Sequence, residues 1–102
     1  MNVNHYILDD NGEIQVADLM TWAQWFESHP DKRRIAYDEL GKAKVSTVFI
    51  GLNHNWGDDP PLLFETMIFG GPHDQDQWRY STREEALAGH ERAKAIAEGM
   101  AF

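Results

Sequence analysis

The sequence predicts an α+β fold: a small antiparallel sheet, built from an N-terminal hairpin and a three-stranded meander, with two helices packed on it. Apolar residues recur at helical spacing within residues 19–26, and small residues do so within 82–98. The residues Asp10-Asn11-Gly12 separate two short apolar runs within residues 5–16, and their Asn-Gly pair is typical of a hairpin turn. Three further runs have the length and composition of strands joined by short links: residues 33–39, 43–52 and 62–71.

Length and composition narrow the class of protein. The chain has 102 residues, the size of one domain, and its 42% hydrophobic content is too high for a disordered chain. It contains no cysteine, which excludes disulfides, thiolate zinc sites and cysteine nucleophiles. No apolar stretch approaches the ~20 residues that cross a bilayer, and the first residues lack a signal peptide's basic start and apolar core. We therefore expect a single cytoplasmic domain that does not enter a membrane.

Acidic side chains outnumber basic ones, 17 to 9, which gives a net charge of −8. Direct binding to a nucleic-acid phosphate backbone is therefore unfavourable. The basic residues fall in two runs, Lys32–Arg34 and Lys42 with Lys44. If the strands that carry them are neighbours, the runs form one basic edge. That edge is either a solvated, charge-protected edge strand or a patch that binds anions or a partner.

The first elements have recognisable boundaries. Asn11 and Gly12 supply the positive φ angles of a tight turn. Asp18 is placed to cap the helix that follows, which must end near Pro30 because the residue before a proline avoids helical angles. Met20 and Trp25 flank the apolar stripe of this helix on opposite sides, about 100° away, and of the two Trp25 is the one expected to be partly exposed. The stripe consists of Leu19, Trp22, Ala23 and Phe26.

The remaining elements complete the meander and its cover. A turn around Gly41 joins the strands at 33–39 and 43–52, and two glycines close the strand at 62–71. The final helix begins with a capping-box pattern that runs from Ser81 to Glu84. Small residues and one histidine form its inward face, which lets the helix lie close to the sheet: Ala86, Gly89, His90, Ala93 and Ala97.

Two titratable side chains fall on faces expected to be apolar. Strand alternation places Glu65 on one face with Leu63, Met67 and Phe69, so its carboxylate must find a donor or have a raised pKa. His90 lies in the middle of the smooth face of the last helix. Each is either a structural group hydrogen-bonded to its surroundings or a functional one; His90 would then be a general base or metal ligand.

A second group of candidates follows the strand at 43–52, since binding residues are common at strand ends. The residues Asn53, His54 and Asn55 offer donors and acceptors, and Trp56 offers a stacking surface. These residues either shape the loop or bind a ligand.

Four tryptophans occur in the chain, and the helix stripe explains only Trp22. Trp25, Trp56 and Trp78 lie outside the expected core, and aromatic residues outside a core often mark a binding surface. Together with the acidic balance, this favours a binding protein over an enzyme.

Catalytic and cofactor motifs are absent. There is no Walker loop, dinucleotide-binding glycine motif, nucleophile elbow, H-E-x-x-H or EF-hand pattern, so we expect no cofactor. The run from His73 to Asp76 carries metal-ligand residue types, but its spacing matches no established metal motif and is typical of a solvated acidic loop. A metal-assisted hydrolase that uses this run, His54, Glu65 or His90 stays open as one alternative.

Three segments together resemble a group of small, largely uncharacterised proteins encoded by tailed bacteriophages and prophages: VSTVFIGLNHNWG, PPLLFETMIFGGP and RYSTREEALAGHERA. The resemblance extends over most of the chain. In that group the position of Asn53 is often aspartate and that of Arg83 often aromatic. The resemblance implies a phage-derived cytoplasmic protein of unassigned activity, and it transfers no catalytic residue.

The sequence therefore predicts a small acidic accessory protein of a phage or prophage that binds a host protein, such as an immune effector or a CRISPR complex. The alternative is a binder or sponge for a small nucleotide-like anion, with Arg33 and Arg34 beside the loop at 54–56. An uncovered sheet face would also allow a homodimer. The candidate binding residues are Trp25, Asn53, His54, Asn55, Trp56, Glu65, Trp78 and His90.

Overall fold

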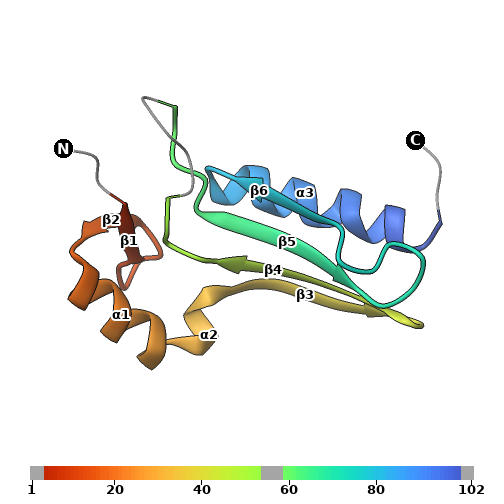
Figure 1. Ribbon diagram of the computed structural model, residues 1–102, viewed down its shortest axis with the longest axis horizontal. Helices are drawn as coiled ribbons and strands as arrows, with labels where there is room; N and C mark the ends of the chain where they lie inside the picture. Colours follow the sequence, from red (N-terminus) through yellow and green to blue (C-terminus); the bar gives the residue numbers. More distant parts are fainter. Residues whose placement is uncertain (1–3, 54–58, 100–102) are drawn as a thin grey trace.

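Two antiparallel sheets and three helices make up residues 4–53 and 59–99, the part of the chain that the structure, a computed structural model, describes (Figure 1). The elements are β1 (His5–Leu8), β2 (Ile14–Ala17), α1 (Leu19–Ser28), α2 (Pro30–Arg33), β3 (Arg34–Leu40), β4 (Ala43–Phe49), β5 (Phe64–Phe69), β6 (Gln77–Tyr80) and α3 (Arg83–Ala97). β1 pairs with β2, while β3, β4, β5 and β6 pair in sequence order. This arrangement confirms the predicted α+β class.

The helices are divided between the two sheets. α3 packs across one face of the four-stranded sheet, where it contacts all four strands (Figure 1). The hairpin, α1 and α2 gather at one end of that sheet, and α1 lies mainly against β1 and α2. Among the described helices, none covers the opposite face of the four-stranded sheet. That face is therefore open.

The N-terminal hairpin forms where predicted, around the turn residues Asp10, Asn11 and Gly12, but Asn11 does not have the expected positive φ. Gly12 has a φ of 80°. The Asp9 N–H donates to the Glu13 carbonyl and the Gly12 N–H donates to the Asp9 carbonyl, each at 2.9 Å. The Asp9 carboxylate also accepts the N–H groups of Asn11 and Glu13. These bonds stabilise a turn that needs only one positive-φ residue.

The capping of α1 is confirmed, and the expected exposure of Trp25 is wrong. The Asp18 carboxylate accepts the Thr21 N–H at 2.7 Å. Trp25 is only 8% exposed, whereas Leu19, which was expected in the buried stripe, is 58% exposed. The Trp25 ring packs edge-on against Phe49 of β4, with ring centroids 5.8 Å apart. The neighbouring sheet therefore selects the buried side of the helix.

β3 and β4 pair as neighbours, but the two basic runs do not meet. Arg34 lies opposite Val48 at one end of the pair, and Lys44 lies opposite Glu39 at the other end. The expected single basic edge is therefore wrong, because antiparallel pairing separates the runs by the length of the strands. Arg33, expected in the strand, ends α2 instead.

The meander has a fourth strand that the sequence analysis missed. β6 pairs with β5, with Trp78 opposite Thr66 and Tyr80 opposite Phe64. Trp78 and Tyr80 therefore share the face covered by α3, and the alternate positions of β6 point to the open face. The alternation Gln-Trp-Arg-Tyr is the signal that would have identified this strand.

α3 forms over the predicted range, with its cap one residue later than expected. Thr82 is the N-cap: its hydroxyl accepts the Glu85 N–H, and the Glu85 carboxylate accepts the Thr82 N–H, both at 3.1 Å. A Cβ at Gly89 would overlap the Tyr80 ring, so this glycine permits the close approach of helix and sheet. The predicted inward face is confirmed by the buried residues Ala86, Gly89, His90 and Ala93.

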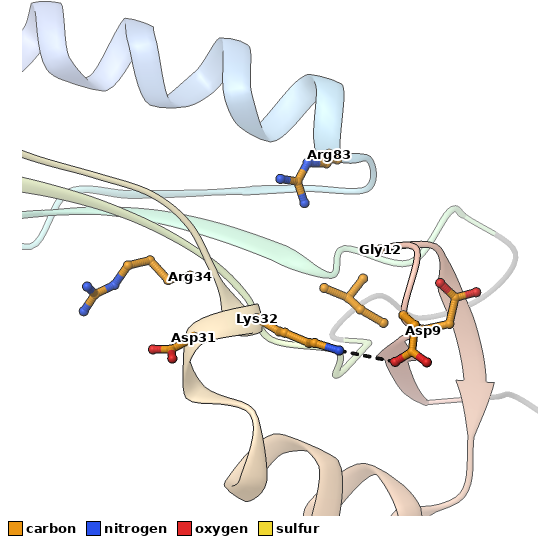
Figure 2. Close-up of a pocket in the computed structure, with 8 residues that line it drawn as sticks. Asp9, Gly12, Asp31, Lys32, Arg34 and Arg83 are labelled. Carbon is orange, nitrogen blue, oxygen red and sulfur yellow. Dashed lines mark hydrogen bonds and ion pairs between the residues drawn. The ribbon is translucent and has the colours of Figure 1, made fainter.

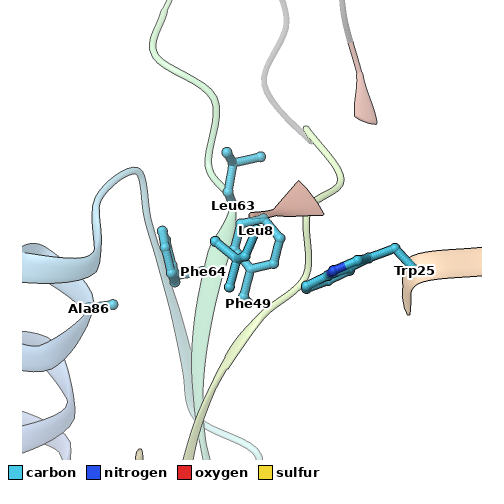
Figure 3. Packing of buried hydrophobic residues seen from close by; sticks show 6 residues of the cluster. All are labelled: Leu8, Trp25, Phe49, Leu63, Phe64 and Ala86. Carbon is cyan, nitrogen blue, oxygen red and sulfur yellow. The ribbon is translucent and has the colours of Figure 1, made fainter. Parts of the chain in front are cut away.

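The core consists of two apolar clusters with polar residues between them. The first cluster joins the hairpin and α1 to the sheet and α3 (Figure 3): Leu8, Trp25, Phe49, Leu63, Phe64 and Ala86. The second lies under the C-terminal half of α3: Ala43, Val45, Ile68 and Ala93. On β4, β5 and α3, a buried polar residue separates the two clusters. We call these three residues the polar layer: Thr47, Thr66 and His90.

Candidate functional site

The polar layer extends into a continuous chain of hydrogen bonds. The hydroxyl oxygens of Thr47 and Thr66 are 2.5 Å apart, and Thr47 Oγ1 lies 2.7 Å from His90 Nδ1. On the other side of the ring, His90 Nε2 lies 2.8 Å from Asp38 Oδ2 on β3. Lys94 Nζ lies 3.7 Å from the same carboxylate oxygen. Three strands and α3 thus contribute side chains to one network.

The side chains are hydrogen-bonded in the order Thr–His–Asp, as in the catalytic triad of a hydrolase. Their burial nevertheless indicates a structural role. A carboxylate only accepts, so His90 Nε2 carries the hydrogen; with a neutral ring, Nδ1 accepts from Thr47, which accepts from Thr66. His90 is 2% exposed and both threonines are fully buried. A substrate therefore has no access to the Thr47 hydroxyl. The chain instead satisfies polar groups inside the core, which is the structural alternative for His90.

Among the four hydrogen-bonded side chains Thr66, Thr47, His90 and Asp38, Asp38 is the one that reaches solvent. The hydrogen bond from His90, followed by the charge of Lys94, holds the pKa of the Asp38 carboxyl below its ordinary value. Asp38 therefore releases its proton more readily in the folded chain than in the unfolded chain. Stabilisation from this residue is present above the unfolded pKa of about 4 and is lost as pH falls through the lower, folded pKa.

We expect the free energy of unfolding to decrease as pH falls below about 4, and Asp38→Asn to weaken this decrease. The asparagine oxygen still accepts the His90 Nε2 hydrogen, but it does not titrate. Asp9 and Asp18 also have lowered pKa values, because backbone N–H groups bond their carboxylates, so part of the decrease will remain. Urea unfolding between pH 3 and pH 7 measures both proteins. An unchanged pH dependence in the variant would contradict this assignment.

The Glu65 carboxylate lies on the open face of the four-stranded sheet, where it accepts a hydrogen bond. Arg79 Nε donates to Glu65 Oε2 at 3.0 Å, across the β5–β6 pair. Met67 and Phe69 share this face, as predicted from alternation. The expected companion Leu63 does not, because it precedes β5 and is buried in the first cluster. The face of Glu65 is therefore a partly exposed surface and not the core face.

The structure does not gather the other predicted binding residues into one site. Trp25 belongs to the first apolar cluster, whereas Trp78 packs against the second one. The Asn53 N–H donates to the Asn4 carbonyl at 2.9 Å, so the segment that follows β4 is bonded to the residue before β1. The predicted residues His54, Asn55 and Trp56 lie outside the described residues.

A pocket of about 240 Å³ opens between the hairpin turn, α2 and the first residue of α3 (Figure 2). Lys32 Nζ lies 3.4 Å from Asp10 in an exposed ion pair. Of the two arginines expected beside an anion, Arg34 lines the pocket, while the Arg33 guanidinium lies 3.9 Å above the Phe26 ring. Charged residues of both signs line the pocket: Lys32, Arg34, Arg83, Asp9, Asp10 and Asp31.

The largest concentration of exposed apolar side chains was not predicted. Seven large hydrophobic residues are exposed in the described part of the chain, and four of them lie within seven consecutive positions. We call these four the 14–20 surface: Ile14 (37% exposed), Val16 (66%), Leu19 (58%) and Met20 (66%). The sequence analysis missed this surface because it assigned Leu19 to a buried stripe.

The segment that carries the 14–20 surface is acidic in sequence. Residues 1–31 contain six acidic side chains and neither lysine nor arginine, so this third of the chain carries −6 of the net charge of −8. Two of these acidic residues, Glu13 and Asp18, directly flank β2, whereas Lys32, Arg34 and Arg83 approach the hairpin turn at the pocket. The acidic residues are Asp9, Asp10, Glu13, Asp18, Glu27 and Asp31.

Comparison with known proteins gives no assignment. No family model, curated protein or solved structure matches the chain. Within residues 4–53 and 59–99, no three His, Asp or Glu side chains are grouped so as to hold a metal ion. Of the helices described, none combines the length and the apolar character needed to cross a bilayer.

Proposed function

We propose that the protein acts by binding another protein through the 14–20 surface. The observation that supports this proposal is the exposure of four large apolar side chains on one short stretch, β2 and the first turn of α1. Burying a side chain of this size contributes about 1.5–3 kcal/mol. Contiguous exposed apolar residues rimmed by charge are typical of protein-binding surfaces.

The partner class follows from the resemblance to phage-encoded proteins and from the charge of the chain. A strongly acidic surface repels nucleic acid and favours a partner with a basic surface. We propose that this partner is a host protein in the bacterial cytoplasm. An immune effector, including a CRISPR complex, is the class to test first.

Affinity purification of the tagged full chain from bacterial cells, followed by native mass spectrometry, tests this proposal. We expect a stoichiometric partner with the wild-type protein and its loss with the double variant Leu19→Gln/Met20→Gln, because both side chains are exposed and their removal leaves the core intact. Leu87→Gln is the matched control, since Leu87 is an exposed hydrophobic residue on α3. Thermal unfolding confirms that each variant folds. An empty wild-type eluate, or a double variant that keeps the partner, would contradict the proposal.

The pocket in Figure 2 favours a second candidate function, the binding of a small anion. Arg34 and Arg83 line it from the starts of β3 and α3, and among the described residues neither guanidinium forms an ion pair with a carboxylate that lines the pocket, unlike Lys32. A guanidinium suits a phosphate. The Arg34 guanidinium lies 5.2 Å from the centroid of the Tyr37 ring and points away from the hairpin, so Arg83 is the main candidate (Figure 2).

We expect inorganic phosphate or a nucleotide to raise the melting temperature if this pocket binds anions. A ligand at 100 times its Kd adds about 2.7 kcal/mol to the free energy of unfolding. Arg83→Gln is expected to abolish the shift, whereas Arg92→Gln, further along α3 and outside this pocket, is expected to leave it unchanged. A melting temperature that no anion raises would exclude this function.

A further inference from the structure

β2 has an unpaired edge. Its partner β1 is bonded on both sides: β2 lies on one side, and on the other the Tyr6 N–H donates to the Gly51 carbonyl at 2.7 Å, next to a bridge between His5 and Leu52. β2 is paired only with β1, and in the described part of the chain no strand lies beyond it. β2 is therefore the outer strand of this layer (Figure 1).

The hydrogen-bond pattern of the hairpin shows which backbone groups point to that edge. Bonded and non-bonded pairs alternate along an antiparallel ladder. Asp9 and Glu13 form a bonded pair, so the pair Leu8–Ile14 is non-bonded, and so is Tyr6–Val16 two positions further on. The Tyr6 N–H accordingly points away from β2, to Gly51. On β2, the N–H and C=O groups of Ile14 and Val16 therefore point outward.

The outward backbone groups and the exposed side chains belong to the same residues. Ile14 and Val16 also carry the exposed apolar groups of β2, and Leu19 and Met20, which follow shortly after in the chain at the start of α1, are exposed as well. Natural edge strands are commonly protected by lysine, proline, a bulge or a short length. β2, with the sequence IQVA, is short but contains no lysine, proline or bulge. This strand thus offers both main-chain and side-chain groups to a partner.

We propose that the partner adds an extended segment, with apolar residues and basic flanks, to β2 as a further antiparallel or parallel strand. This inference rests on the proposed protein-binding function. Main-chain bonds to Ile14 and Val16 give such strand addition its affinity, and alternate side chains of the segment give it specificity. The 14–20 surface receives the apolar side chains. The acidic residues Glu13 and Asp18, which flank β2 at its two ends, favour basic residues at the ends of the added segment.

Charge also favours a basic segment of another protein over a second copy of this chain as the partner of β2. Pairing of β2 with its own copy brings together two units that each carry −6 in residues 1–31, with Glu13 and Asp18 at the ends of the paired strands. Like charges placed together at an interface are unfavourable. A basic segment from another protein has no such cost.

A designed probe tests the mode of binding on the full chain. The probe is a short peptide of alternating lysine and valine, and its binding is followed by amide chemical shifts in ¹⁵N-labelled protein. We expect the shifts to concentrate at Ile14 and Val16, and affinity to fall at least about tenfold when every peptide nitrogen is methylated, since methylation removes the main-chain donors. A peptide of alternating glutamate and valine is expected not to bind. Equal affinity of the methylated peptide, or shifts elsewhere, would overturn strand addition.

A pair of variants at one position tests the same point with the cellular partner. Val16→Pro removes an N–H that points outward and makes no bond to β1, so the hairpin keeps its ladder. Val16→Ala removes the same side-chain contacts but keeps the N–H. We expect partner binding to be weaker by about tenfold in the proline variant than in the alanine variant. If the two bind equally while Leu19→Gln/Met20→Gln does not bind, the surface is correct and strand addition is wrong. If the double variant also binds, the proposed function itself fails.

Discussion

Replacing His90 with alanine is expected to lower the free energy of unfolding by about 4 kcal/mol. The substitution leaves a cavity between the two apolar clusters, and it removes the group that bonds Thr47 and Asp38. The buried Thr47 hydroxyl then keeps only the bond with Thr66. Equilibrium unfolding in urea, followed by tryptophan fluorescence, measures this loss.

Asp38→Asn is the matched control for this effect. Because Asp38 is partly exposed, water solvates its side chain, and the asparagine oxygen still accepts the His90 Nε2 hydrogen. We expect a loss of less than about 1 kcal/mol at pH 7. A His90→Ala protein that unfolds at the wild-type urea concentration would show that the polar layer contributes nothing to stability.

Gly51→Ala is expected to cost about 3 kcal/mol or more. Gly51 has a φ of 64°, which an alanine adopts only with strain, and its carbonyl accepts the Tyr6 N–H that ties β1 to the rest of the fold. A Cβ at this position would overlap the Tyr6 carbonyl oxygen and would lie 2.9 Å from the Phe49 and Trp22 rings. The hairpin would have to move away from the sheet, which exposes part of the first cluster.

Gly41→Ala separates the two causes of this cost. Gly41 has nearly the same φ, 62°, but nothing lies within 4 Å of its added Cβ. We expect a loss of about 1 kcal/mol, which is the backbone term alone. The difference between the two variants in thermal or urea unfolding then gives the steric term at Gly51. Equal losses would mean that the hairpin shifts at no cost.

Local sequence patterns were sufficient for most of the fold. The Asp18 cap, the strands around Gly41 and the small-residue face of α3 each depend on neighbours in the sequence, so spacing and capping chemistry predict them. Trp25 shows where such reasoning fails. Its burial depends on contact with Phe49, 24 positions away, and a helix's own periodicity does not report which of its sides meets a distant strand.

The candidate site was harder to predict than the fold for the same reason. Asp38, Thr47, Thr66 and His90 are far apart in the sequence, and only the strand register brings them together. The 14–20 surface exists because no other described part of the chain covers Val16 and Met20. A local sequence pattern does not show whether a distant segment will cover a side chain. The tryptophans outside the helix stripe were expected to mark a binding surface. Trp25 instead belongs to the first cluster, and Trp78 packs against the second.

The polar layer has a consequence for how uniquely this sequence folds. Sliding β4 by two residues along β5 would keep every side chain on its correct face, so apolar packing alone discriminates weakly against it. That slip would place Thr47 opposite Phe64 or Ile68 and would separate its hydroxyl from Thr66. The polar layer therefore specifies the strand register, because only one register of the strands under α3 allows all three polar residues to form their hydrogen bonds. An all-apolar replacement could gain stability and, we expect, would lose this single alignment.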